Sequence, residues 1–133
     1  HPPTEIKATI QAIKGLGRKV TVVFQPHRFS RTIHLAHDFG PVFEHADRVL
    51  LTDIYAAGEQ NPNQVQVNVI YDAVKKTGHP DVRIVARDQI INFLLSHPEG
   101  DQTVAFLGAG DIGEIADDFA SRFEDSYSHQ RST

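Results

Sequence analysis

Short apolar runs alternate with amphipathic segments along most of this chain. The apolar runs are of strand length and predict strands over residues 20–24, 48–53, 82–86 and 103–107. The segments around them carry apolar residues three or four positions apart, which predicts helices over residues 3–16, 30–46, 64–77, 89–96 and 111–123. Strands that alternate with helices are typical of βαβ units. We therefore expect an α/β fold with an open, mainly parallel sheet and helices on both faces.

Two of these predicted helices carry conflicting signals. A Gly-Pro pair at residues 40–41 kinks or interrupts the helix over 30–46, because proline lacks a backbone donor and clashes with the preceding turn. In the segment 64–77, valines at every second position from Val65 to Val69 alternate as they would in a strand. The helical interpretation of this segment is therefore open.

The segment Phe24–Thr32, with the sequence FQPHRFSRT, joins the first predicted strand to the next helix. Ligands bind at the carboxyl ends of parallel strands, and a helix N-terminus attracts anions. His27, Arg28 and Arg31 thus indicate an anion site, since the guanidinium fork of arginine matches phosphate or carboxylate. The alternative is a solvated first turn with incidental charge, but the helix dipole disfavours cations there. If the turn is helical, Arg28 and Arg31 share a face.

The segment Asp53–Glu59, with the sequence DIYAAGE, follows the second predicted strand and belongs at the same edge of the sheet. Its carboxylates, on Asp53 and Glu59, could orient an ammonium group or the arginines. A flexible loop in which Gly58 supplies a turn is an equally good interpretation.

Gly108–Gly113 matches the pattern G-x-G-x-x-G between a strand and a helix. A dinucleotide site would also need a following strand with an acidic residue for the ribose, and here the next helix is the last predicted element. We expect these glycines instead to let the helix pack closely or to line a domain interface. The chain has no G-x-x-x-x-G-K-[ST] loop and no G-x-S-x-G motif, so we expect it to catalyse nothing alone.

Composition narrows the function classes further. The net charge of -4 over 133 residues leaves no basic excess for nucleic acid. No apolar run has the length of a membrane span, so we expect neither nucleic acid nor membrane as a partner. The absence of cysteine excludes disulfides and fits a cytosolic protein. His34 and His37 have a metal-compatible spacing, but no third ligand accompanies them and we expect no metal site.

The two ends of the chain carry their own signals. The sequence has no methionine and begins at His1, which indicates a piece of a longer protein cut at a domain boundary. Residues 124–133 are polar and are expected to form a disordered tail after a single domain over residues 1–123.

Four segments together resemble the bacterial Mur ligases that add L-alanine. The opening HPPTEI is similar to the family's His-His-Pro-Thr-Glu-Ile, with Pro2 in place of the second histidine and His1 remaining. The segments 24–32 and 53–59 resemble its Gln-Pro-His-Arg and Asp-(Ile/Val)-Tyr-Ala-Ala-Gly-Glu motifs, and 108–112 resembles its Gly-Ala-Gly-Asp-Ile. The resemblance covers about residues 1–123 and implies a Rossmann-like C-terminal domain of a three-domain enzyme.

The resemblance implies that the whole protein is a bacterial, cytoplasmic ligase of peptidoglycan synthesis. Its substrates would be UDP-N-acetylmuramate, L-alanine and ATP, and an N-terminal and a central domain absent from this chain would hold most of the ATP and Mg²⁺. ATP would phosphorylate the lactyl carboxylate, and the alanine amine would attack the acyl phosphate. The third domain would close over the others.

The resemblance also implies roles for individual residues. Arg28 and Arg31 would contact carboxylate or phosphate, and His27 would orient the substrate. Tyr55 to Glu59 would line the amino-acid side, and His1, at the hinge between domains, is a weaker candidate for an alanine contact.

Two alternatives remain open. One is a sibling ligase domain that adds another amino acid or a peptide. The other is a stand-alone anion- or nucleotide-binding α/β module of the receiver type, although residues 25–28 lack the acidic residues that a receiver carries after its first strand.

Overall fold

A computed structural model describes the backbone of residues 2–108 and 110–132, with side chains as far as residue 122. The order of its elements agrees with the pattern of apolar segments. The helices are α1 (Pro3–Lys14), α2 (Phe29–Phe39), α3 (Asn68–Lys76), α4 (Ile90–Ser96) and α5 (Ile112–Ser132), with 3₁₀ turns η1 (Pro41–Phe43) and η2 (Arg87–Gln89). The strands are β1 (Lys19–Gln25), β2 (Arg48–Leu51), β3 (Val82–Ile84) and β4 (Gln102–Gly108).

The described strands form one sheet in the order β3-β2-β1-β4, and every pair is parallel. This arrangement confirms the predicted α/β fold. β1 lies in the middle, with β2 on one side and β4 on the other, so the chain reverses its direction of winding between β1 and β4. In open α/β sheets, ligands bind beside such a switch point, outside the carboxyl ends of the strands.

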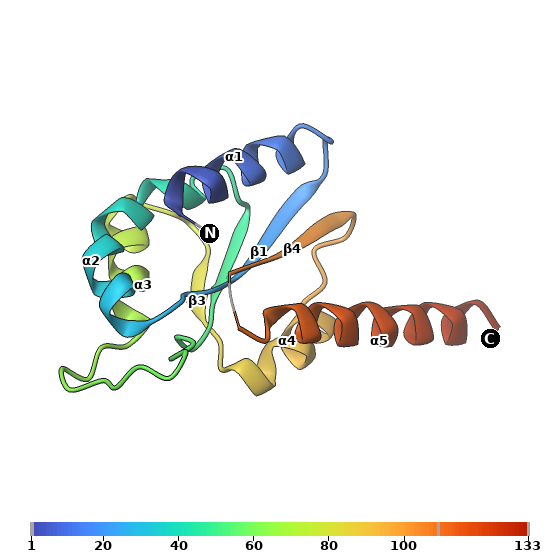
Figure 1. Ribbon diagram of the computed structural model, residues 1–133. Helices are drawn as coiled ribbons and strands as arrows, with labels where there is room; N and C mark the ends of the chain where they lie inside the picture. Colours follow the sequence, from blue (N-terminus) through green and yellow to red (C-terminus); the bar gives the residue numbers. More distant parts are fainter. Residues whose placement is uncertain (1, 109, 133) are drawn as a thin grey trace.

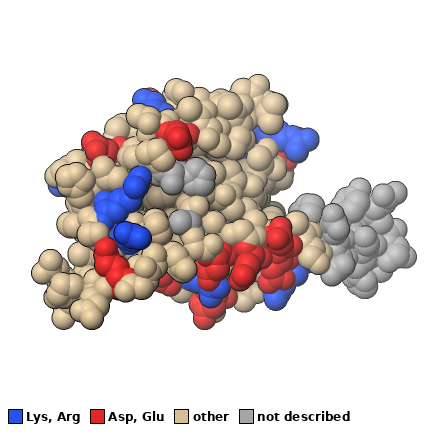
Figure 2. Space-filling view, viewed as in Figure 1, with Lys and Arg blue, Asp and Glu red and all other residues tan. Residues whose placement is uncertain are grey.

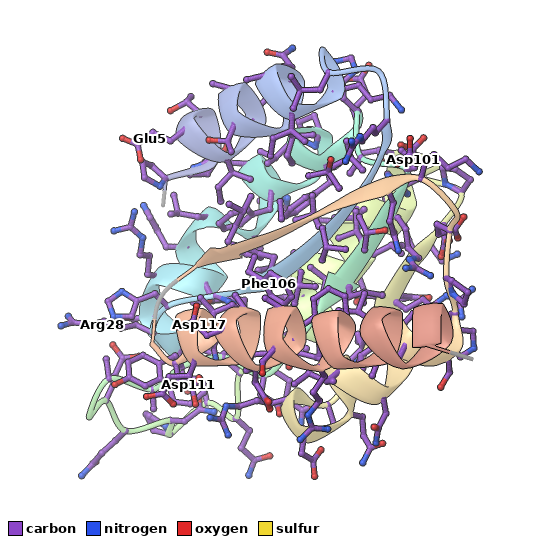
Figure 3. The ribbon with its side chains drawn as sticks, turned by 90° about the vertical axis from the view of Figure 1, so that its right-hand side faces the viewer. Glu5, Arg28, Asp101, Phe106, Asp111 and Asp117 are labelled. Atoms are coloured by element: carbon purple, nitrogen blue, oxygen red, sulfur yellow. The ribbon has the colours of Figure 1, made fainter. Side chains whose placement is uncertain are left out.

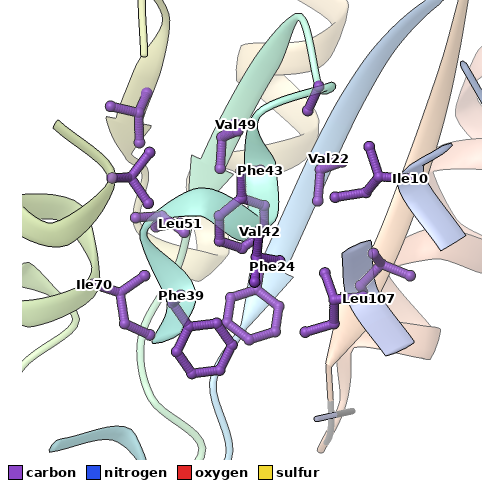
Figure 4. Packing of buried hydrophobic residues seen from close by; sticks show 14 of the residues in the cluster. Ile10, Val22, Phe24, Phe39, Val42, Phe43, Val49, Leu51, Ile70 and Leu107 are labelled. Carbon is purple, nitrogen blue, oxygen red and sulfur yellow. The ribbon is translucent and has the colours of Figure 1, made fainter. Parts of the chain in front are cut away.

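Helices cover both faces of the sheet (Figure 1): α1, α2 and α3 lie on one face, and α4 and α5 on the other. The side chains of β1 alternate between two apolar clusters, because successive residues of a strand point to opposite faces. Phe24 belongs to the cluster under α1–α3 and Val23 to the cluster under α4 and α5. Phe24 packs against Phe39 and Phe43, with ring centroids 5.2 and 5.5 Å apart (Figure 4).

The structure differs from several predicted boundaries, and the third strand, for example, ends at Ile84 rather than at residue 86. The second predicted strand ends at Leu51, and Pro41 ends α2 as expected, with a separate 3₁₀ turn after it. The third helix starts at Asn68 rather than near residue 64, because the Asn61 side chain bonds the N–H and C=O of Val65 and holds this segment in a turn.

The last helix extends past its predicted end at residue 123. The backbone of residues 124–132 is helical, and the expectation of a disordered tail stays a prediction. The sequence there contains neither glycine nor proline, so nothing in it stops a helix that has already begun. The domain boundary at residue 123 stays a prediction.

The amino ends of the strands form an edge rich in paired charges, which we call the amino edge (residues 14–20, 47–48, 81–83 and 97–102). Arg48 is only 2% exposed and donates to the carbonyl of His97 at 2.8 Å, with Phe93 packed against its guanidinium. Burial lowers the pKa of Arg48, and Glu99 opposes that shift. The ion pairs found here are Lys14–Asp47, Arg18–Asp101, Lys19–Glu99, Arg48–Glu99 and Arg83–Asp81.

The described part of the chain contains no helix long and apolar enough to cross a membrane.

Candidate functional site

The carboxyl ends of the strands bring the motif segments together at the opposite edge, which we call the carboxyl rim (residues 25–31, 52–59, 85–87, 108, 110 and 111). Figure 3 shows Arg28 and Asp111 at this end of the molecule and Asp101 at the other. The parallel register explains this grouping, because Phe24 pairs with both Leu51 and Leu107. Segments far apart in sequence therefore meet at one edge.

Arg28 stands between β1 and α2 in an unusual backbone conformation, with φ 67° and ψ 143°. Few residues other than glycine adopt a positive φ without strain. Its N–H donates to the carbonyl of Tyr55 at 2.8 Å, and its carbonyl accepts from the N–H and hydroxyl of Thr32 at 3.1 and 2.7 Å. Arg28 precedes the first helical residue, so the condition under which it would share a helix face with Arg31 is not met.

Arg28 and Arg31 are both exposed. Within the described residues, neither makes an ion pair. Figure 2 shows basic side chains gathered on the face over α2 and acidic ones along α5. Arg31 and His27 border a cavity of about 80 Å³ at the end of β1. Its lining residues are Phe24, Gln25, Pro26, His27, Arg31, Thr32, Phe39 and Gly108. The cavity thus lies beside Arg31, which makes no ion pair within the described part of the chain.

Glu59 closes the start of α2 from the neighbouring loop. Its two carboxylate oxygens accept from the backbone N–H and the hydroxyl of Ser30 at 2.8 and 2.6 Å. These hydrogen bonds, the hydroxyl first, lower the pKa of Glu59, and the charge of Arg28 adds to the shift. A carboxylate at a helix N-terminus is stabilised by free N–H groups and by the dipole. Glu59 therefore orders the start of α2, next to Arg28 and Arg31.

Tyr55 links the loop after β2 to the loop after β1. Its N–H donates to the carbonyl of Pro26 at 2.9 Å, which forms a parallel bridge with His27 beyond the ends of the strands. The rings of Tyr55 and His27 are stacked, with centroids 6.0 Å apart and planes 16° from parallel. His27 is thus flanked by the backbone bridge to Tyr55 and by the aromatic ring of the same residue.

Two glycines at the end of β4 lie close to other segments, although the contacts are with β1 and the Tyr55 ring rather than the close helix packing expected from the sequence. A Cβ on Gly108 would lie 2.1 Å from the carbonyl oxygen of Gln25, and one on Gly110 would lie 2.5 Å from the Tyr55 ring. Both have a positive φ, 128° and 77°. Gly113 has no neighbour within 4 Å of such an atom, so the packing role belongs to the first two glycines.

An ion pair between Arg87 and Asp111 joins η2 to the start of α5. The N–H of Arg87 also lies 3.5 Å from a carboxylate oxygen of Asp53. Arg87 is not among the site residues predicted from the sequence. It follows the third predicted strand, so its position at the carboxyl end of a parallel strand could have indicated it. The loops after all four strands are therefore connected.

Buried polar groups on the carboxyl rim also escaped prediction. Gln25 and Thr52 are almost fully buried, and their Oε1 and Oγ1 atoms have no hydrogen-bond partner among the described residues. An unpaired buried polar group costs about 1–3 kcal/mol, so few occur in folded proteins. Gln25 and Thr52 each follow an apolar run. Nothing in the sequence indicates that their side chains are buried without a hydrogen-bond partner.

The structure brings together His27, Arg28, Arg31, Tyr55 and Glu59 from the predicted site. His1 lies outside the described residues. No group of three potential metal ligands occurs within the part of the chain that the structure describes, and His34 and His37 are exposed on α2.

Comparisons with known proteins bear on this site. The family model described as Mur ligase, glutamate ligase domain, matches residues 1–110. Curated proteins called UDP-N-acetylmuramate–L-alanine ligase are 40% identical over 128 residues in Geotalea daltonii and 39% identical over 125 residues in Gloeobacter violaceus. One from Anaeromyxobacter dehalogenans is 42% identical over 114 residues. The matches cover 95%, 93% and 84% of this chain but only 28%, 27% and 25% of those relatives.

Proposed function

The chain belongs to the Mur ligase family, and from that membership we propose that it is the C-terminal, active-site-closing domain of an ATP-dependent ligase. The proposed enzyme joins L-alanine to UDP-N-acetylmuramate during peptidoglycan synthesis in the bacterial cytoplasm. The relatives that carry this activity in their names match at least 84% of this chain. The structural observation that carries the proposal is the pair of exposed arginines at the carboxyl rim, Arg28 and Arg31, which make no ion pair among the residues that the structure describes.

The proposed reaction has two steps. ATP transfers a phosphoryl group to the lactyl carboxylate of UDP-N-acetylmuramate, which gives an acyl phosphate and ADP. The neutral amine of L-alanine then attacks the carbonyl carbon. Its nitrogen gives up one proton to solvent as the tetrahedral intermediate expels phosphate, which leaves the amide. Negative charge accumulates on the carboxylate, the phosphoryl group and the oxyanion, so fixed cations at these positions accelerate the reaction.

In this proposal, Arg28 and Arg31 contact the carboxylate or phosphate groups. His27, at the mouth of the cavity beside Arg31, orients the substrate. Tyr55 to Glu59 line the amino-acid side, and Glu59 orders the start of α2 at the same time. His1 is proposed as a weaker alanine contact at the hinge.

The described residues do not fit a complete site for ATP and Mg²⁺. The chain has no G-x-x-x-x-G-K-[ST] loop, and its described part offers no cluster of three acidic or histidine ligands. We propose that the N-terminal and central domains hold most of the ATP and the magnesium. This domain would add its arginines when it closes over them and excludes water.

The test is product formation by the full-length protein. It is incubated with ATP, Mg²⁺, UDP-N-acetylmuramate and either L-alanine, another amino acid or a dipeptide. Phosphate release is followed together with the mass of the product. The proposal predicts an L-alanine adduct and preference for L-alanine in competition. Preference for another amino acid or a peptide would support the sibling ligase instead, and tight nucleotide binding by this chain alone would support a stand-alone module.

A further inference from the structure

We propose that Tyr55 is a positioning residue whose aromatic ring, rather than its hydroxyl, fixes His27 and the turn after β4 against each other. The effect that we expect on catalysis rests on the proposed function. The claim that the Tyr55 ring holds His27 and the turn in place rests on contacts in the structure alone. The role differs from a direct contact with the amino acid, because Tyr55 would act through the residues that it holds.

The position of Tyr55 itself is tightly determined by the backbone. Its N–H donates to the carbonyl of Pro26, and its carbonyl accepts from the N–H of Arg28, at 2.9 and 2.8 Å. These two hydrogen bonds extend the pairing of β1 and β2 past the ends of both strands. The Tyr55 side chain therefore starts from a fixed point in the middle of the carboxyl rim.

The ring then makes contact with two segments that are distant in sequence. It stacks on His27, 16° from parallel. It also lies against the backbone of Gly110, where a Cβ would come within 2.5, 2.6 and 3.0 Å of ring carbons. A residue larger than glycine at position 110 would have to displace the ring, so the turn and the ring determine each other's place.

The exposure of this residue supports a function beyond packing. Tyr55 is 40% exposed and lies outside both apolar clusters. Its hydroxyl makes no hydrogen bond to the described residues. A large ring that stabilises no core yet holds two loops of a site suits the positioning of a reacting group, since misplacement by about 1 Å can cost a hundredfold in rate.

The kinetic test uses the full-length ligase with Tyr55→Leu, Tyr55→Phe and a control, Tyr71→Leu. Tyr71 is half-buried on α3 and packs against the larger apolar cluster, so the control removes a tyrosine ring away from the carboxyl rim. We expect Tyr55→Leu to lower kcat roughly tenfold with little change in the KM for ATP. Tyr55→Phe should restore most of the rate, and Tyr71→Leu should stay within about twofold of wild type.

A double-mutant cycle on the 133-residue chain tests the geometry without any activity. Gly110→Ala is measured by urea unfolding in the wild-type and in the Tyr55→Ala background. The strain from the positive φ of residue 110 is the same in the two backgrounds. The difference between the two costs of Gly110→Ala therefore measures its contact with the Tyr55 ring. We expect Gly110→Ala to lower the urea midpoint less when the ring is absent.

The outcomes separate this inference from the proposed function. If Tyr55→Phe loses as much rate as Tyr55→Leu, the hydroxyl acts and the inference is overturned. Equal costs of Gly110→Ala in both backgrounds would also overturn it. If the wild-type ligase makes no product, the proposed function fails, and the unfolding cycle still decides whether the ring holds the turn.

Discussion

The amino edge and the carboxyl rim of the sheet both carry arginines, but these arginines have different partners. At the amino edge, Arg18, Arg48 and Arg83 each face a carboxylate within 4 Å. At the carboxyl rim, Arg87 is paired with Asp111, whereas Arg28 and Arg31 have no ion pair among the described residues. One edge has neutralised its cations internally, and the other presents two of them to solvent.

This difference separates the edge whose charges stabilise the fold from the edge at which we propose that the domain acts. Cations that are paired and partly buried hold segments together, as Arg48 holds the segment before β4 to the start of β2. Unpaired exposed cations contribute little to folding and remain available to an anionic ligand. The comparison therefore predicts that mutations at the two edges will affect different properties.

The largest expected effect on stability is at the amino edge. Arg48→Leu removes the hydrogen bond to His97 and leaves Glu99 without its buried partner. We expect the free energy of unfolding to fall by about 3 kcal/mol, measured by urea denaturation of this chain. A loss below about 1 kcal/mol would mean that Arg48 is not a structural residue.

At the carboxyl rim, Arg28→Gly should change stability and activity in opposite directions. Glycine relieves the strain at φ 67° and stabilises the fold by about 1 kcal/mol after its own entropy cost. Loss of the guanidinium should lower kcat/KM of the full-length ligase roughly tenfold. The control is Arg28→Lys, which keeps the charge and the strain. If Arg28→Gly gains stability and keeps full activity, Arg28 does not contact the substrate.

Asp47, at the amino edge, makes a smaller contribution to the free energy of unfolding, and this contribution depends on pH. Burial raises its pKa, but the hydrogen bonds from the Lys14 ammonium and the Val20 N–H outweigh burial, so the net pKa is lowered. A lowered pKa contributes stability above the unfolded value near about 3.9, and this contribution is lost as the pH falls through the folded value. We expect Asp47→Asn to flatten the dependence of unfolding free energy on pH below about pH 4, by less than about 1 kcal/mol. An unchanged slope would contradict the role of the carboxylate.

The smallest effect should come from the exposed pair of Arg18 and Asp101, whose side chains are 55% and 84% exposed. Arg18→Ala should change the free energy of unfolding by no more than about 0.5 kcal/mol. A larger loss of stability, measured by thermal or urea unfolding, would show that the exposure of an ion pair does not predict how much it stabilises the fold.

The pattern of apolar residues predicts the fold well because it is a local signal. Each predicted strand and helix exists, and β1 and α1 agree to within two residues at either end. The parallel direction of the strands also follows from the local alternation of strands and helices. The grouping of the candidate site residues could also be predicted in this way, because the carboxyl ends of parallel strands meet at one edge whatever their side chains are.

The contacts that complete the site depend on distant residues and carry no local signal. The positive φ of Arg28 depends on hydrogen bonds to Tyr55 and Thr32. The cap on α2 comes from Glu59, 29 residues after the Ser30 that it binds. The pairing of Arg87 with Asp111 depends on how closely η2 approaches α5. Periodicity cannot predict such pairs, because it describes one element at a time.

The central claim is that the carboxyl rim binds an anionic group of the substrate while the amino edge does not. The most direct test is a comparison of Arg31→Ala with Arg18→Ala in the full-length ligase, with kcat/KM for UDP-N-acetylmuramate measured by phosphate release. A charge-assisted contact contributes about 1.5–3 kcal/mol, so Arg31→Ala should lower kcat/KM roughly tenfold or more. Arg18→Ala should remain within about twofold of wild type. Equal activity of the two variants would contradict the claim.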